Sequence, residues 1–113
     1  MPADENVLTR LMRIIQDRQA HPSPQSYTAA LLAGGVPRIA AKIAEEAAET
    51  IAAADEPGAA GRAHLVREAA DLVYHLLVLL AARGAAWADV EADLASRFGV
   101  SGLEEKAARG PTE

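Results

Sequence analysis

Two pairs of acidic residues are the part of this sequence best suited to chemistry. The pairs are Glu46 with Glu49 and Glu68 with Asp71, each three residues apart. At that spacing, both members of a pair project from one face of a helix. If the helices pack together, four carboxylates converge, and like charges raise one another's pKa unless a cation intervenes. Oxygen ligands suit Mg²⁺, with Mn²⁺ as a substitute, and such ions bridge to substrate phosphates. The pattern therefore indicates metal-assisted cleavage of a phosphoanhydride by water.

The elements that must position these acids are two helices adjacent in the sequence. Pro37 suits the first turn of a helix over residues 37–54. The sequence DEPG at 55–58 predicts a turn, and helical periodicity continues over residues 60–83. Antiparallel packing across this turn would aim both acidic pairs at a common point.

The remainder of the chain also has helical patterning, and no segment shows the alternation of a strand. Further helices are expected over residues 6–19, 27–33 and 87–98, with Ser26 as an N-cap and Gly34-Gly35 as a break. We expect one all-α domain over residues 1–113, a bundle of four to five helices with short connections. Its ends, 1–5 and 109–113, are expected to fray.

The helix expected over residues 60–83 carries a narrow polar stripe. At about 100° per residue, Glu68, Asp71 and His75 fall within an arc of roughly 60°. His64 joins them one turn earlier. Leucine, valine and alanine cover most of the remaining circumference, so core residues flank the stripe, unlike the wide solvated face of a surface helix.

The preceding helix has a complementary pattern. Its apolar side is defined by Ile39, Ile43 and Ile51. Glu46 borders that side, whereas Glu45 points almost directly away from it. Glu46 is therefore expected to meet the acidic stripe of the next helix.

Each of these features also has a simpler interpretation. Acids three residues apart are common on solvated helix faces, so neither pair identifies a site alone. His75 reads first as a core histidine bonded to a carbonyl, and His64 as a surface residue. Lys42 either pairs with Glu46 at i,i+4 or contacts a phosphate.

Composition narrows the class of protein. The chain has 113 residues, of which 50% are hydrophobic and 24% charged, as in an ordinary globular domain. A formal net charge of −5 argues against nucleic acid as a partner, and the lack of cysteine excludes thiolate metal sites. The start MPADENVLTR does not resemble a signal peptide, and no apolar stretch suits a membrane span. We expect a cytoplasmic protein with no membrane partner.

Longer segments around the acids resemble a known family. EExxE at 45–49, followed after eighteen residues by ExxD at 68–71, is similar to the signature of the all-α nucleotide pyrophosphohydrolase superfamily. Within it, the chain most resembles the phosphoribosyl-ATP pyrophosphatases of histidine biosynthesis. The segments that carry this likeness are SYTAALLAGG, KIAEEAAETIAAA, EAADLVYHLLVLLAARG and SGLEEKAAR, at 26–35, 42–54, 68–84 and 101–109.

The resemblance implies hydrolysis of phosphoribosyl-ATP to phosphoribosyl-AMP and pyrophosphate, with Mg²⁺ on the acidic cluster. It implies that the metal ligands are Glu46, Glu49, Glu68 and Asp71, with Glu45 as a further acid that bonds or polarises the attacking water. The substrate contacts that it implies are Lys42, Ser26, Tyr27, His75 and Lys106. It also implies a homodimer, which suits a short bundle with little core of its own.

The chain departs from the family's pattern at three positions, and at one of them Ala48 replaces a frequent threonine. Ala30 and Ala41 stand where a lysine is common, which leaves Lys42 and Lys106 as the only lysines in the sequence. Any lysine contact to phosphate or ribose must therefore use one of these two.

Two other functions stay open at this point. The first keeps the chemistry but changes the substrate: a house-cleaning enzyme for ordinary or damaged nucleoside triphosphates. The second is a non-enzymatic helical dimerisation module whose acidic stripes pair with basic partners. In that case Mg²⁺ should neither bind nor stabilise the protein, whereas a ligand specific for the folded state must stabilise it.

Overall fold

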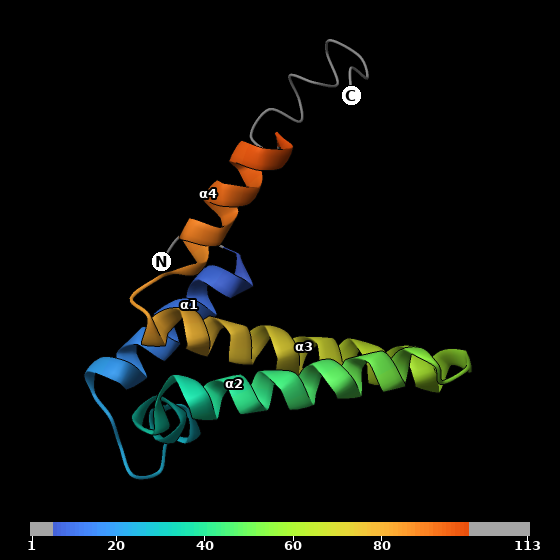
Figure 1. Ribbon diagram of the computed structural model, residues 1–113, viewed down its shortest axis with the longest axis horizontal. Coiled ribbons are helices and arrows are strands. Elements are labelled where there is room, and N and C mark those ends of the chain that lie inside the picture. The colour runs from blue at the N-terminus through green and yellow to red at the C-terminus, as the bar shows by residue number, and fades with distance from the viewer. Residues whose placement is uncertain (1–5, 100–113) are drawn as a thin grey trace.

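Four α-helices make up the described part of the chain, residues 6–99 of a computed structural model (Figure 1). They are α1 (Val7–Ala20), α2 (Tyr27–Ala54), α3 (Gly58–Ala82) and α4 (Trp87–Phe98). No strand occurs among these residues, which confirms the expected all-α class. The segment 101–109 with Lys106, and the ends expected to fray, lie outside the described residues.

The helices α2 and α3 form a long antiparallel hairpin, and α1 packs against both helices at one end of it (Figure 1). From that end α4 extends away and contacts α1. Side chains cap the starts of α1 and α2, because Asn6 Oδ1 accepts from the Thr9 amide at 2.8 Å and Ser26 Oγ from the Ala29 amide at 3.0 Å. The N-cap predicted at Ser26 is therefore confirmed.

A single non-helical residue, Gly35, interrupts α2. The sequence predicts two helices on either side of Gly34-Gly35, and the structure has one element with a kink at this position. Gly35 has φ 80° and ψ 178°, a conformation that residues with a Cβ rarely adopt. Pro37, two residues further on, lies in the first turn of the straight part of the helix, as predicted. The kink turns the segment that begins at Tyr27 relative to the straight part.

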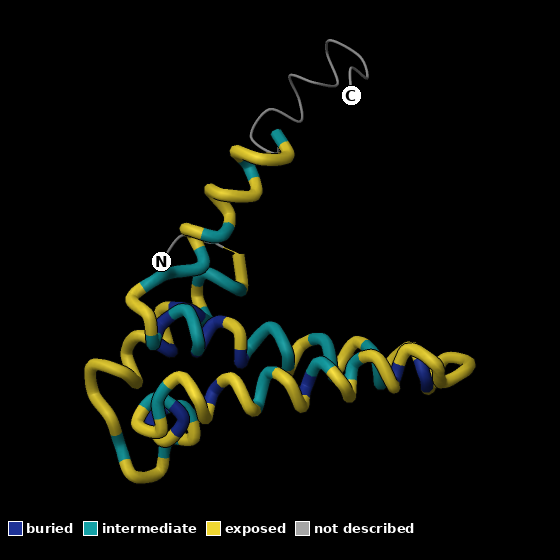
Figure 2. The backbone as a smooth tube through the Cα atoms, viewed as in Figure 1, coloured by how far each residue is buried: buried dark blue, intermediate teal, exposed yellow. Residues whose placement is uncertain are grey.

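The hydrophobic core lies where α1 meets the hairpin. Its buried members are Met12, Ile15, Leu31, Ile39, Leu77, Val78 and Ala81. Trp87 at the start of α4 and Ile43 on α2 are partly buried against this cluster. Figure 2 shows most of the buried positions near this end, while the far half of the hairpin is mainly exposed or intermediate.

Beyond α1 the hairpin is only two helices thick, so its outer faces meet solvent. Ile51, predicted on the apolar side of its helix, is 71% exposed, and that part of the prediction is wrong. The helical period was right, but no third element covers Ile51 in the described chain. Val66 lies almost opposite the acidic stripe around α3, on the side nearer α1, and is also 63% exposed. In the described part of the chain, no helix is long and apolar enough to cross a membrane.

Candidate functional site

Three of the predicted acids meet between the two helices of the hairpin. Glu46 on α2 and Glu68 and Asp71 on α3 each offer a carboxylate oxygen, and these atoms lie within 4.8 Å of one another. Glu46 is only 7% exposed, whereas Glu68 is partly buried and Asp71 is exposed. The i,i+3 spacing and the tight turn at 55–57 bring these side chains together, as the sequence predicts.

The fourth acid, Glu49, lies against Glu68. The hydrogen bond it shares with Glu68 raises the pKa of Glu49, and burial and the nearby charge of Glu46 raise it further. Glu49 therefore brings a fourth carboxylate next to Glu68, although it is exposed and is not among the three acids whose oxygens meet.

Glu46 carries the clearest sign of an unsatisfied charge. Burial, followed by repulsion from Asp71 and Glu68, raises the pKa of Glu46. Glu46 Oε1 and Glu68 Oε1 are both inaccessible to solvent and have no hydrogen-bond partner. Buried polar atoms without a partner are costly, and a divalent cation would satisfy both oxygens. The donors are all carboxylate oxygens, which fit Mg²⁺ or Mn²⁺.

Lys42 and Glu45 form an ion pair beside this cluster. Lys42 Nζ lies 2.8 Å from Glu45 Oε1 and 4.0 Å from Glu46 Oε2, so its closer partner is Glu45 and not Glu46. The hydrogen bond from Lys42 lowers the pKa of Glu45 and raises the pKa of Lys42. Both side chains are therefore charged at neutral pH. Glu45 is exposed and is not among the three acids that meet.

His75 is a buried histidine whose two ring nitrogens are both engaged. Its Nδ1 donates to the Asp71 carbonyl oxygen at 2.8 Å, which confirms the carbonyl-bonded interpretation. In the neutral ring, Nε2 then accepts from the Tyr27 hydroxyl, also at 2.8 Å. This bond ties the start of α2 to the acidic stripe of α3. Direct contact of Tyr27 or His75 with substrate stays a prediction, as it does for the capping residue Ser26.

His64 lies between an acid of the cluster and an acid of the turn, and the sequence did not predict its contact with the turn. Its Nε2 lies 3.1 Å from Glu68 Oε2, and its Nδ1 lies 3.0 Å from both carboxylate oxygens of Glu56. Hydrogen bonds to Glu56 and then to Glu68 raise the pKa of His64. The i,i+4 spacing of His64 and Glu68 was a visible signal, whereas Glu56 comes from the turn and depends on its shape.

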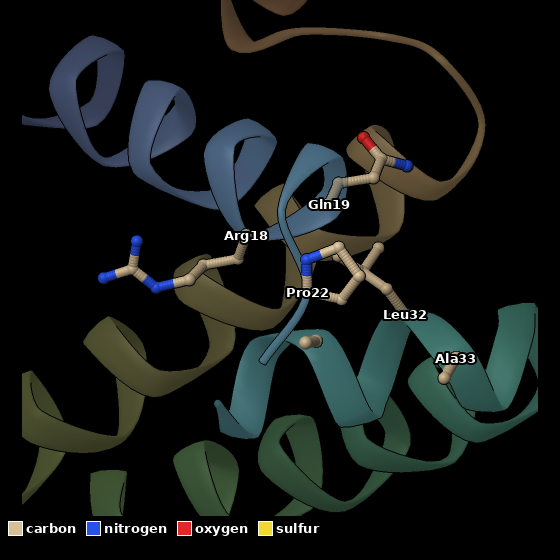
Figure 3. Close-up of a pocket in the computed structure, with 6 residues that line it drawn as sticks. Arg18, Gln19, Pro22, Leu32 and Ala33 are labelled. Atoms are coloured by element: carbon tan, nitrogen blue, oxygen red, sulfur yellow. The ribbon is translucent and has the colours of Figure 1, made fainter. Parts of the chain in front are cut away.

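The acids lie apart from a cavity near the end of α1. That cavity, of about 260 Å³, is lined by Arg18, Gln19, Pro22, Ala29, Leu32 and Ala33 (Figure 3). None of the predicted acids lines it, and its side chains offer no carboxylate. The acids that meet therefore lie on the hairpin and not at this cavity.

The fold is a helical hairpin with carboxylates facing one another between its two helices. This arrangement is typical of proteins that use a divalent metal to hydrolyse phosphate compounds. Residues 8–98 match the family described as phosphoribosyl-ATP pyrophosphohydrolase, and the chain belongs to that family. A phosphoribosyl-ATP pyrophosphatase of Rhodopirellula baltica is 50% identical over 109 residues, which cover 96% of this chain and 91% of the relative. A phosphoribosyl-ATP pyrophosphatase of Parvibaculum lavamentivorans is 51% identical over 110 residues, which cover 97% of this chain and 98% of the relative.

Proposed function

We propose that this chain hydrolyses phosphoribosyl-ATP to phosphoribosyl-AMP and pyrophosphate, the second step of histidine biosynthesis. Membership of the family and the names of relatives about half identical over nearly the whole chain support the substrate. The observation that carries the chemistry is the meeting of Glu46, Glu68 and Asp71 oxygens within 4.8 Å. Magnesium dependence and a cytoplasmic location are part of the proposal.

Glu46, Glu49, Glu68 and Asp71 would hold the divalent cation. When bound, that ion would stabilise the negative charge of the phosphates as a Lewis acid. The four carboxylates supply oxygen ligands from two rigid helices, so their geometry is set before substrate arrives. Two of their oxygens are already buried and have no hydrogen-bond partner, so no hydrogen bond to either oxygen has to be broken before it binds a cation.

Glu45 and Lys42 have complementary roles beside the acids. Water cleaves the linkage between the α- and β-phosphoryl groups: its oxygen bonds to phosphorus, and pyrophosphate leaves. The carboxylate of Glu45, which Lys42 keeps ionised, accepts a hydrogen bond from that water and takes its proton. Lys42 Nζ, already among the acids, donates to a phosphate oxygen as the substrate enters.

The direct test is pyrophosphate release by the purified protein from phosphoribosyl-ATP, with Mg²⁺, with Mn²⁺ and with a chelator. We expect turnover with either metal and none with the chelator. A parallel panel of ribo- and deoxyribonucleoside triphosphates separates this activity from house-cleaning. Faster turnover of any ordinary triphosphate than of phosphoribosyl-ATP would overturn the substrate assignment.

We also propose that two copies of the chain assemble through α1 and α3. A shallow cavity of about 460 Å³ is lined entirely by apolar residues of these helices: Val7, Leu8, Leu11, Val66, Ala69, Ala70 and Val73. Val7 and Val66 are 64% and 63% exposed. Because exposed apolar patches mark interaction sites, a second copy is proposed to cover them. Val66→Asp should shift the mass measured by light scattering from dimer to monomer, and an unchanged mass would refute this surface.

A further inference from the structure

A chain of hydrogen bonds connects the turn of the hairpin to one of the acids. Glu68 Oε2 faces His64 Nε2 at 3.1 Å, while Glu68 Oε1 is buried and has no partner. His64 thus holds one oxygen of the carboxylate and leaves the other one for a ligand. Because a held oxygen restricts rotation of the side chain, this contact fixes where Glu68 Oε1 lies.

His64 is itself held from the opposite side. Its Nδ1 lies 3.0 Å from both Oε1 and Oε2 of Glu56. Each ring nitrogen therefore faces a carboxylate, and the ring cannot turn away from Glu68 without losing both contacts. Glu56 is thereby connected, through one imidazole, to a residue at the acidic cluster.

The turn is shaped to deliver Glu56 to this position. Gly61 is buried in the first turn of α3, and a Cβ there would lie 2.2 Å from the backbone oxygen of Glu56. Such a distance is far inside van der Waals contact. Only glycine at position 61 lets the backbone of Glu56 pack this closely on α3, which brings its side chain over His64.

We propose that His64, held by Glu56, is a positioning residue that orients Glu68 for the divalent cation and so sets the affinity for that cation. This inference rests on the proposed function, because it takes Glu68 as a metal ligand. Repulsion from Glu46 and Glu49 would otherwise favour rotation of Glu68 toward solvent. Loss of a residue that orients a metal ligand typically weakens metal binding about 10–100-fold.

A purely structural role for His64 makes a different prediction. The side chains of His64 and Glu56 are 36% and 48% exposed, and ion pairs at such exposure contribute little to stability. If they served only as a surface pair, their removal would leave metal binding unchanged. Metal affinity therefore separates the two roles better than stability does.

The experiment measures binding of Mn²⁺ by the loss of its free electron paramagnetic resonance signal, and of Mg²⁺ by the rise in Tm, both without substrate. We expect His64→Ala and Glu56→Ala to weaken both metals by about tenfold or more. His64→Gln should recover part of the loss, because its amide can still donate to Glu68. In turnover assays, saturating Mg²⁺ should restore much of the kcat of His64→Ala.

The matched control is His21→Ala, since His21 Nδ1 also pairs with an acid at i,i+4, Asp17, at 3.2 Å, but belongs to the end of α1. It should leave metal affinity unchanged. If wild type binds metal and His64→Ala binds it equally well, the positioning role is wrong and the proposed function stands. If wild type binds neither metal, the metal site of the proposed function is wrong, and this inference is wrong with it.

Discussion

The two halves of the α2–α3 hairpin are built from the same helices but serve different purposes. Near α1, the side chains of Leu31, Ile39 and Leu77 are completely buried. Farther along, Glu46 is buried among other carboxylates, and the surfaces on either side of the acids meet solvent (Figure 2). Apolar burial stabilises one half, whereas the other half holds crowded carboxylates, and two of their buried oxygens, Glu46 Oε1 and Glu68 Oε1, have no hydrogen-bond partner among the described residues.

The stability of the chain and its proposed chemistry therefore depend on separate halves of the hairpin, called here its core layer and its acidic layer. A site of unpaired acids costs stability, and the core at the other end must offset that cost. Substitutions in the two layers should therefore have opposite signatures. Core changes lower stability, whereas changes among the acids remove activity and spare the fold.

The largest expected loss of stability comes from Leu77→Ala. Leu77 is fully buried between the helices, and truncation leaves a cavity that typically costs about 2–5 kcal/mol. Urea unfolding followed by circular dichroism measures the change. Leu94→Ala is the control, because Leu94 on α4 is 39% exposed and should cost much less. Equal costs for the two variants would contradict the location of the core.

Among the acids, Asp71→Asn and Glu49→Gln should reduce turnover about 10²-fold or more, the order expected when one transition-state contact is removed. Their helical spectra and urea midpoints should stay close to those of wild type. Asp93→Asn is the control, since Asp93 is an exposed acid on α4 paired with Arg97. Near-normal pyrophosphate release by both Asp71→Asn and Glu49→Gln would rule out the proposed metal ligands.

Glu46→Gln should stabilise the metal-free protein by about 1 kcal/mol at neutral pH, because it removes a buried, unsatisfied charge. The pKa of Glu46 is raised by folding, so its favourable contribution is present below the unfolded value of 4.5 and is lost as pH rises through the folded pKa. The advantage of the variant should therefore shrink as pH falls toward 4.5. Tm measured against pH for both proteins, without metal, tests this prediction.

With Mg²⁺ present, the sign of that comparison should reverse. Wild type should gain Tm from the cation, and Glu46→Gln should gain little or nothing. A metal-free Glu46→Gln protein that is less stable than wild type at neutral pH would show that Glu46 is already satisfied in the folded chain.

The smallest expected effect compares two glycines at opposite ends of α3. Gly58 at the turn and Gly84 at the core end both have φ 74°, and neither has an atom near its missing Cβ. Each Gly→Ala change should cost about 1 kcal/mol through backbone strain alone. Urea unfolding should report equal costs if the hairpin unfolds as one unit. A much smaller cost for Gly58→Ala would mean that the turn opens before the core.

Local patterns in the sequence were sufficient to predict most of the architecture. Helical spacing, the N-cap at Ser26, the break at Gly34-Gly35 and the turn predicted at 55–58 depend on neighbours within a few residues, and the structure has all of them. The same local rules predicted that the two acidic pairs would meet. The spacing of the residues places each acidic pair on one face of its helix. Because the turn between the two helices is short, they are expected to pack antiparallel.

Tertiary structure alone decided how deep each side chain lies and which partner it takes. The sequence placed Glu46 at the border of the apolar side but could not show that it is almost fully buried, and it placed Ile51 on an apolar side that the described chain leaves exposed. It also could not show that Glu56 reaches His64 across the turn. Periodicity gives direction around one helix, whereas burial and partner choice depend on which other elements pack against that direction, and on how far they extend.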